Sequence, residues 1–352
     1  VIDASLFPQG ERELGTGVVI SPVVVNDNVV DLLVTPGENP GDPLHVRVSP
    51  DVGLFNFVNE AATGQPNTRL ALRRAITRDS TGKVTLRLTG TYAVHGAPLV
   101  MSVAVDDPSE LARRGLIAAL RDRGVSVRDT AAPSLKSALS TDVPVYADSM
   151  RVAEHISLPL AEAIKVTLKV SENLHASMTP YIVGALVKHA RGRAALAAGF
   201  DAERQFLESA GLDLMAAAQG DGAGGAPGAF YSPNVVVQYL AYMATRSDSA
   251  IFRRALPILG RDGTLWNIEQ QSPAAGHVFA KTGTFSVNDP LNRRSIVTGK
   301  GLAGYMTTAS GKRVSFAIYA NRVPFPPNYA GDATLVVGQA LGEIAAAIWS
   351  MQ

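Results

Sequence analysis

The tripeptide Lys281-Thr282-Gly283 combines three residue types that together suit the anionic end of a substrate. The lysine supplies positive charge and the threonine can donate a hydrogen bond. The glycine lets a substrate backbone lie flat along the chain, because nothing projects from its α-carbon. A lone tripeptide of this kind arises by chance about 0.1 times in a chain of this length. An ordinary strand end with an exposed lysine is therefore the plainer interpretation, and the surrounding residues must decide.

A Ser-x-Asn pattern offers a second set of polar groups, and it occurs three times. About one occurrence is expected by chance, so position has to separate the three. Ser232 precedes a proline and is better used as a helix cap, and Ser286 follows the tripeptide in a predicted loop. Ser171-Glu172-Asn173 lies between two predicted helices, where both polar side chains can point into a cleft. Serine chemistry without histidine can combine Ser-x-x-Lys, Ser-x-Asn and Lys-Thr-Gly.

The elements that must position these residues are a small sheet and its backing helix. The tripeptide begins the first of three predicted antiparallel strands, and residues 301–308 and 312–320 form the other two, joined as a hairpin. Residues 285–300 are interpreted as a long loop that could overhang the cleft. A helix is predicted over about 332–351. Its apolar face comprises Leu341, Ile344, Ala345 and Ile348.

The remainder of the chain divides by composition. Residues 1–145 consist mainly of short β runs bounded by Gly, Pro, Asn and Asp, with one helix beginning at Asp107 and ending at Gly124. From residue 146 the pattern becomes helical, and a glycine-rich loop covers 221–228. We therefore predict β-rich accessory domains over 1–145 and a second domain over 146–352 that carries the chemistry.

Composition excludes several classes of function. The 352 residues are 46% hydrophobic and 18% charged with a net charge of +1, which gives no argument for nucleic acid. The absence of cysteine excludes disulfides, thiol catalysis and cysteine-based zinc sites. The six histidines show no metal-ligand spacing, so we expect no metal and no cofactor. We expect no membrane span. Because Val1 begins what reads as the middle of a strand, we interpret the chain as a processed or truncated product.

Several motifs in order along the chain carry a family resemblance. Residues 169–174, with the Ser-x-Asn triplet at their centre, closely resemble the central motif of the class C penicillin-binding proteins. This is the D-alanyl-D-alanine carboxypeptidase/endopeptidase family with a large insertion. Further stretches that look like this family are Ser21-Pro22, Val25-Asn26-Asp27-Asn28, Thr35-Pro36-Gly37, Ser157-Leu158-Pro159-Leu160, Gly260 to Leu265, Ala280 to Thr284 and Gly304-Tyr305. The resemblance covers nearly the whole chain.

The resemblance implies an α/β (α+β) fold, in which a β-lactamase/transpeptidase-like core of antiparallel sheet and helices is interrupted by inserted β-rich domains. It implies that Ser171 relays protons, Asn173 holds the substrate amide and Lys281 provides positive potential. The resemblance also assigns Thr282 to the terminal carboxylate of the substrate. The backbone N–H of Thr284 would form half of an oxyanion hole, and Gly283 would lie against the substrate.

The same resemblance places a Ser-x-x-Lys nucleophile before the inserted domains, upstream of Val1. We therefore expect no such motif within this chain, and we expect the chain alone to be inactive. A second departure from the family follows Asn173, where Leu174-His175-Ala176-Ser177 lacks the acidic residue that the family often has.

The resemblance implies a serine-type D-Ala-D-Ala carboxypeptidase acting outside the cytoplasm, with endopeptidase activity as a second expectation. Its expected partners are peptidoglycan stem peptides ending in D-Ala-D-Ala and β-lactams, and it would act through an acyl-enzyme. Two alternatives stay open. One is a non-catalytic peptidoglycan-binding scaffold, which the sequence upstream of Val1 would distinguish. The other is a related hydrolase such as a β-lactamase or esterase, against which the accessory block argues.

Overall fold

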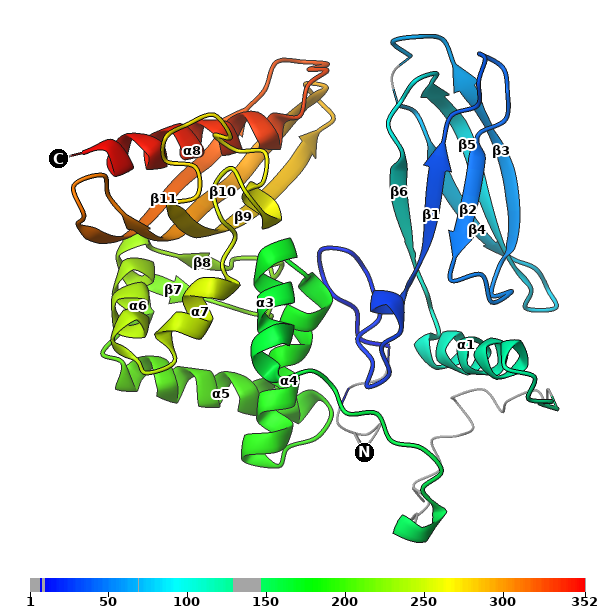
Figure 1. Cartoon of the computed structure of the whole chain (residues 1–352), viewed down its shortest axis with the longest axis horizontal. Helices are drawn as coiled ribbons and strands as arrows, with labels where there is room; N and C mark the ends of the chain where they lie inside the picture. Colours follow the sequence, from blue (N-terminus) through cyan, green and yellow to red (C-terminus); the bar gives the residue numbers. More distant parts are fainter. Residues whose placement is uncertain (1–6, 8–9, 69, 129–146, 352) are drawn as a thin grey trace. The chain divides into compact units, whose positions relative to one another are not determined.

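The computed structural model describes residues 7, 10–68, 70–128 and 147–351. The chain forms two compact units (Figure 1). The N-terminal unit holds most of the chain up to Val152, and the C-terminal unit holds Ala153–Gln352 together with Glu13–Gly15. The sequence-based division at 145/146 falls a few residues before the change of unit. The strand expected around Val1 lies outside the described residues.

The N-terminal unit is a β-sandwich. One sheet has the order β2-β1-β6 and the other the order β3-β5-β4, with β3 and β5 parallel and the other pairs antiparallel. Alternating apolar residues of both sheets, such as Leu32, Leu86 and Val103, meet in one buried cluster. The six strands are β1 (Val29–Thr35), β2 (His45–Ser49), β3 (Asn56–Gly64), β4 (Arg73–Arg78), β5 (Val84–Ala93) and β6 (Leu99–Ala104).

Helix α1 (Pro108–Asp122) follows β6, and its start agrees with the sequence. The carboxylate of Asp107 accepts a hydrogen bond from the Glu110 N–H, and Gly124 adopts a positive φ just beyond the helix. The apolar spacing in the sequence predicts an inward face of Ala112, Leu116, Ala119 and Leu120. That face is wrong, because Leu111 is buried whereas Leu116 is 62% exposed.

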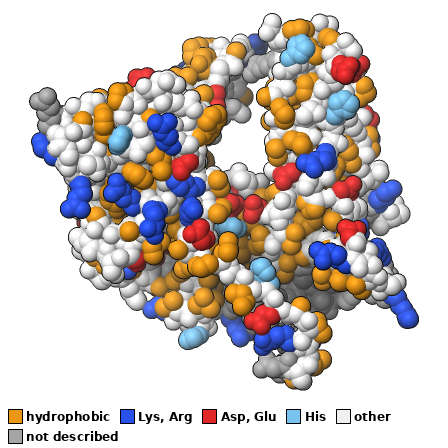
Figure 2. All heavy atoms as spheres, viewed as in Figure 1, with side chains coloured by type: hydrophobic (Ala, Val, Ile, Leu, Met, Phe, Trp, Pro, Cys, Tyr) orange, Lys and Arg blue, Asp and Glu red, His pale blue; other side chains and the backbone are white. Residues whose placement is uncertain are grey.

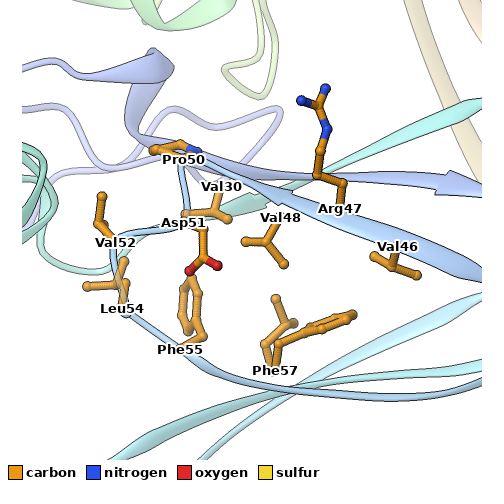
Figure 3. Close-up of a pocket in the computed structure, with 11 residues that line it drawn as sticks. Val30, Val46, Arg47, Val48, Pro50, Asp51, Val52, Leu54, Phe55 and Phe57 are labelled. Atoms are coloured by element: carbon orange, nitrogen blue, oxygen red, sulfur yellow. The ribbon is translucent and has the colours of Figure 1, made fainter. Parts of the chain in front are cut away.

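A cavity of about 450 Å³ opens among residues of β1, β2, β5 and the segment that leads into β3 (Figure 3). Phe55, Phe57 and Val48 line it, and the guanidinium of Arg47 points away from it. Its walls are mainly apolar side chains of the sandwich, so it is a packing gap of this unit and carries no evident chemistry.

The C-terminal unit combines helices with a three-stranded antiparallel sheet of order β11-β10-β9. The strands are β9 (Val278–Asp289), β10 (Arg294–Thr307) and β11 (Arg313–Pro324), and a short pair is formed by β7 (Ala217–Ala218) and β8 (Phe230–Tyr231). The helices are α3 (Leu160–Val170), α4 (Asn173–Lys188), α5 (Arg193–Ser209), α6 (Pro233–Thr245), α7 (Ser249–Ala255) and α8 (Ala333–Ser350). Figure 1 shows α8 lying across the sheet, as the sequence predicted.

The core of this unit lies between the sheet and α8. Val278, Leu302 and Met306 of the sheet are at most 2% exposed and pack with Leu341 and Ala345 of α8. Each such buried aliphatic side chain contributes about 1.5–3 kcal/mol. This packing fixes the face of the sheet that points away from solvent, and with it the direction of each side chain on β9.

One element differs from the sequence-based interpretation. Residues 285–300 do not form a loop, because β9 continues to Asp289 and β10 begins at Arg294, so that the hairpin is extended. Most side chains of β9 beyond Gly283 are exposed, and this part of the edge strand therefore lacks the one-sided burial that produces a strand pattern.

Helix α8 is the one helix in the described part of the chain that is long and apolar enough to cross a membrane. The expectation that no run approaches this length is corrected on that criterion. A buried core helix meets the same criterion, and Leu341 and Ala345 of α8 are buried against the sheet. Figure 2 shows Lys and Arg side chains beside Asp and Glu side chains and apolar groups on the visible surface, which agrees with the small net charge.

Candidate active site

The junction between α3 and α4 presents Ser171 and Asn173. Helix α3 ends at Ser171, whose left-handed backbone (φ 62°, ψ 53°) reverses the chain, and α4 begins at Asn173. The intervening Glu172 caps α4, because its carboxylate accepts hydrogen bonds from the N–H groups of Leu174 and His175. Left-handed backbone is uncommon for a residue other than glycine and is often found at functional sites. The two polar residues are thus held at a sharp turn between two rigid helices.

Lys281 reaches this junction from the sheet. Its Nζ donates a hydrogen bond of 2.8 Å to Ser171 Oγ, although the two residues lie 110 positions apart, and a second one of 2.7 Å to the Thr282 carbonyl. Burial of the ammonium, together with the smaller effect of the nearby Lys300 charge, lowers the pKa of Lys281 to about 8. The predicted juxtaposition of Ser171 and Lys281 is therefore present. Lys281 can exchange a proton near neutral pH, because its charged and neutral forms are close in free energy.

The outer edge of β9 is open beside the tripeptide. β9 is an edge strand of its sheet, and only its beginning is covered, where the Ala280 N–H donates to Pro257 O and Val278 O accepts from the Leu259 N–H. Backbone groups alternate in direction along a strand. The N–H groups of Thr282 and Thr284 therefore point to the same outer side as that of Ala280, and an extended peptide can pair along this edge.

Gly283 lies at this open part of the strand. A Cβ added to Gly283 would meet no atom within 4 Å, so a side chain would project into open space rather than into the protein. The absence of a side chain leaves room for a second backbone to approach. The role of Gly283 beside a substrate backbone stays a prediction.

A tight loop joins the sheet side of the site to helix α3. Lys169 Nζ lies 2.6 Å from Asp262 Oδ2, and Thr282 Oγ1 lies 2.8 Å from Thr264 Oγ1. Between them Gly263 has a φ of +59°, and a Cβ there would lie 2.5 Å from the Lys169 carbonyl oxygen. Only glycine fits this approach. The sequence had singled out residues 260–265 by resemblance but had assigned no contact to Thr264.

Asn173 also faces a close neighbour. A Cβ added to Gly15 would lie 3.1 Å from Asn173 Nδ2, so the segment Glu13–Gly15 passes beside this amide. The Gly15 N–H donates to the Glu13 carboxylate. Asn173 thus lies two residues from Ser171 at the same junction, with its amide held beside the backbone of a segment from the other end of the chain.

Thr284 has a partner that sequence reasoning missed. Lys300 Nζ donates a hydrogen bond of 2.7 Å to Thr284 Oγ1 across β9 and β10, where Lys300 and Thr284 are paired. Burial lowers the pKa of Lys300, which the charge of Asp332 partly offsets. No sequence signal marked Lys300, because it was interpreted as the end of a loop whose register was unknown.

The expectation that the chain contains no Ser-x-x-Lys sequence is wrong. Ser80-Thr81-Gly82-Lys83 has that spacing, in the turn between β4 and β5. Asp79 Oδ1 accepts hydrogen bonds from the N–H groups of Thr81 and Lys83, and all four residues are exposed. A serine and lysine that share one face at this spacing need a helix. The residue types at these positions are accounted for by the hydrogen bonds of the turn, and we assign them no catalytic role.

The described residues contain no group of three or more His, Asp or Glu side chains that could hold a metal ion. The groups at the junction are hydroxyl, amide, ammonium and backbone N–H groups. These groups can bind a carboxylate, polarise a carbonyl and move a proton between Ser171 and Lys281.

Comparison with known proteins gives one family. A family model described as "D-Ala-D-Ala carboxypeptidase 3 (S13) family" matches residues 2–335. A D-alanyl-D-alanine carboxypeptidase from Actinomadura sp. is 27% identical over 321 residues, which cover 89% of this chain and 53% of the relative. The D-alanyl-D-alanine carboxypeptidase DacB of Haemophilus influenzae is 23% identical over 332 residues, which cover 91% of this chain and 64% of the relative. The chain thus spans between about half and two thirds of the length of these relatives.

The comparison of folds agrees with the family match. The crystal structure of penicillin binding protein 4 (dacB) from Haemophilus influenzae superposes with a TM-score of 0.71 at 19% identity, covering 99% of this chain and 74% of that one. A structure of the same protein in complex with a β-lactam gives a TM-score of 0.67. The predicted fold class, a transpeptidase-like core with additional β-rich domains, is therefore confirmed.

Proposed function

Because the chain belongs to the D-Ala-D-Ala carboxypeptidase 3 (S13) family, we propose that it forms the substrate-binding part of a penicillin-binding serine D-Ala-D-Ala carboxypeptidase. The enzyme would acylate a serine with release of D-alanine and then hydrolyse the acyl-enzyme. The observation that carries the proposal is the 2.8 Å hydrogen bond from Lys281 Nζ to Ser171 Oγ. It joins the two motifs that the family uses together.

The pair Ser171 and Lys281 is proposed to move protons during acylation and deacylation. The lowered pKa of Lys281, about 8, lets the amine take up or release a proton near neutral pH, and Ser171 Oγ lies within hydrogen-bond reach. The left-handed backbone at Ser171 keeps its hydroxyl at the helix junction. Lys281 would in addition provide positive potential to a substrate anion.

The open edge of β9 is proposed to bind the peptide. The substrate backbone would lie beside Gly283, its terminal carboxylate would accept a hydrogen bond from Thr282, and Asn173 would hold its amide. The Thr284 N–H, which points to the open edge, would stabilise the oxyanion that develops on the carbonyl. The substrates would be peptidoglycan stem peptides ending in D-Ala-D-Ala, with β-lactams as inhibitors. Such a substrate places the enzyme outside the cytoplasm.

Binding to this chain tests the proposal without requiring turnover. Titration with N-acetyl-D-Ala-D-Ala, followed through the backbone amide resonances of Gly283 and Thr284, should show saturable shifts. The enantiomer N-acetyl-L-Ala-L-Ala serves as the control, and it should bind more weakly because its methyl groups point to the other side of the peptide backbone. Equal binding of both peptides, or shifts confined to the N-terminal unit, would refute the proposed site.

A further inference from the structure

Lys300 is a second cation beside the tripeptide. It lies opposite Thr284 in the register of β9 and β10, and its Nζ donates to Thr284 Oγ1 at 2.7 Å. Its side chain borders a cavity of about 120 Å³ that Thr282 and Thr264 also line. Lys300 therefore lies on β10 beside the part of β9 that carries the residues proposed to bind the substrate carboxylate.

The direction of this hydrogen bond determines which further hydrogen bond the Thr284 hydroxyl can make. An ammonium group only donates, whereas a hydroxyl has one hydrogen to donate and two lone pairs to accept with. When Thr284 Oγ1 accepts from Lys300, its own hydrogen is left to donate to another acceptor. No acceptor for it is recorded among the described residues, so an incoming anion could receive it.

The charge of Lys300 is not neutralised by an ion pair within the described residues. The carboxylate of Asp332 acts on the pKa of Lys300 through its charge, but it caps helix α8 and accepts hydrogen bonds from Thr334 and from the Leu335 N–H. The charge of Lys300 is also felt at Lys281, whose pKa it lowers. Two partly buried cations that repel each other are stabilised together when an anion binds between or beside them.

We propose that Lys300 is a specificity-determining positioning residue, which holds the Thr284 hydroxyl as a donor to the free carboxylate end of the peptide. This inference rests on the proposed function for the identity of the peptide. Lys300 would act in two ways, by fixing the hydroxyl direction and by adding positive potential. The protein would therefore discriminate a C-terminal carboxylate from the neutral carboxamide, and this discrimination would depend on Lys300.

The experiment compares two probes on three forms of this chain. The probes are N-acetyl-D-alanine and N-acetyl-D-alaninamide, which differ only in the charge of the end group. The forms are the wild type, Lys300→Met, and Lys312→Met as a control that removes one exposed positive charge from the turn between β10 and β11. Affinities come from titrations that follow the Thr284 amide resonance, and the intact tertiary structure of each variant is checked by urea unfolding.

We expect the wild type and Lys312→Met to favour the carboxylate probe by about tenfold or more, as one charge-assisted hydrogen bond typically provides. Lys300→Met should lose about tenfold in affinity for the carboxylate and little for the carboxamide. Lys300→Arg should restore only part of the preference, because a planar guanidinium presents its donors differently. A preference that survives in Lys300→Met, or no preference in the wild type, would overturn the inference. If the carboxylate preference follows Lys300 but N-acetyl-D-Ala-D-Ala is not favoured over its L,L enantiomer, the proposed function fails and the inference stands.

Discussion

Replacing Lys281 with Met should measure how far the burial of an ammonium group lowers the free energy of unfolding. Burial lowers the pKa of Lys281 from its ordinary value of 10.5 to about 8. At about 1.36 kcal/mol per pH unit, this fall corresponds to about 3 kcal/mol. Methionine keeps a similar unbranched stem and removes the charge, so Lys281→Met should lack this pH-dependent term.

The sign of the effect follows from proton binding. Between about pH 8 and pH 10.5 the unfolded chain keeps the Lys281 proton while the folded chain has released it. The free energy of unfolding of the wild type therefore rises with pH through this window. Below about pH 8 the full penalty is present, and above 10.5 it is absent. At pH 7 Lys281→Met removes the cost of burying the ammonium, but it also loses the hydrogen bonds to Ser171 Oγ and Thr282 O. The second effect offsets much of the first.

Tryptophan fluorescence suits the measurement, because the chain has two tryptophans, Trp266 and Trp349, and both lie in the C-terminal unit. Urea unfolding of the wild type and of Lys281→Met would be measured at pH 7, 8, 9 and 10. The stability of the wild type relative to the variant should rise by about 2–3 kcal/mol over this range. Other titrating groups are common to both proteins and cancel in the difference. A difference between the two proteins that stays constant with pH would refute the assignment of a buried, pKa-shifted ammonium.

Three further outcomes are expected. Lys281→Ala should reduce D-alanine release by the enzyme that carries this chain by about a hundredfold or more, with little loss of melting temperature, and Lys281→Arg should not fully restore it. Gly304→Ala should destabilise the C-terminal unit by about 1–3 kcal/mol or more in urea unfolding, because its Cβ would lie 2.0 Å from a carbonyl oxygen of β9. Lys169→Met should cost about 1–3 kcal/mol, since it removes the partner of Asp262, whereas Lys165→Met, which breaks an exposed pair, should stay within about 0.5 kcal/mol.

Where the sequence carried local signals, the structure agrees with it. The beginning of α1 was predictable because Asp107 and Pro108 are a cap and a first-turn proline, and both act locally. The order of the three strands and α8 was predictable from apolar runs separated by a short turn. The inward face of α1 was not, because it depends on which neighbouring segment covers the helix, and Leu111 rather than Leu116 meets that segment.

The site was predictable only where residues were marked by type and spacing. Ser171 and Lys281 were marked by their motifs, and the structure brings them within hydrogen-bond distance. Thr264 and Lys300 were not marked, because their contacts depend on the path of a loop and on strand register. Lys300 meets Thr284 because β9 stays paired with β10 beyond Gly283, where the side chains of β9 are mostly exposed and show no alternation.

The geometry of the site depends on a loop that supplies no proposed proton donor or acceptor for catalysis. The motif containing Lys281 lies on the sheet and Ser171 lies between helices, so neither motif by itself brings them together. Residues 260–265 do so, through the ion pair of Asp262 with Lys169, the close approach that requires Gly263, and the hydroxyl contact of Thr264 with Thr282. One side of this loop contacts the helix that ends at Ser171, and the other side contacts the strand that carries the tripeptide. A change in the loop should therefore lengthen the Lys281–Ser171 contact and weaken the coupling of the two groups, even when every proposed catalytic residue is retained.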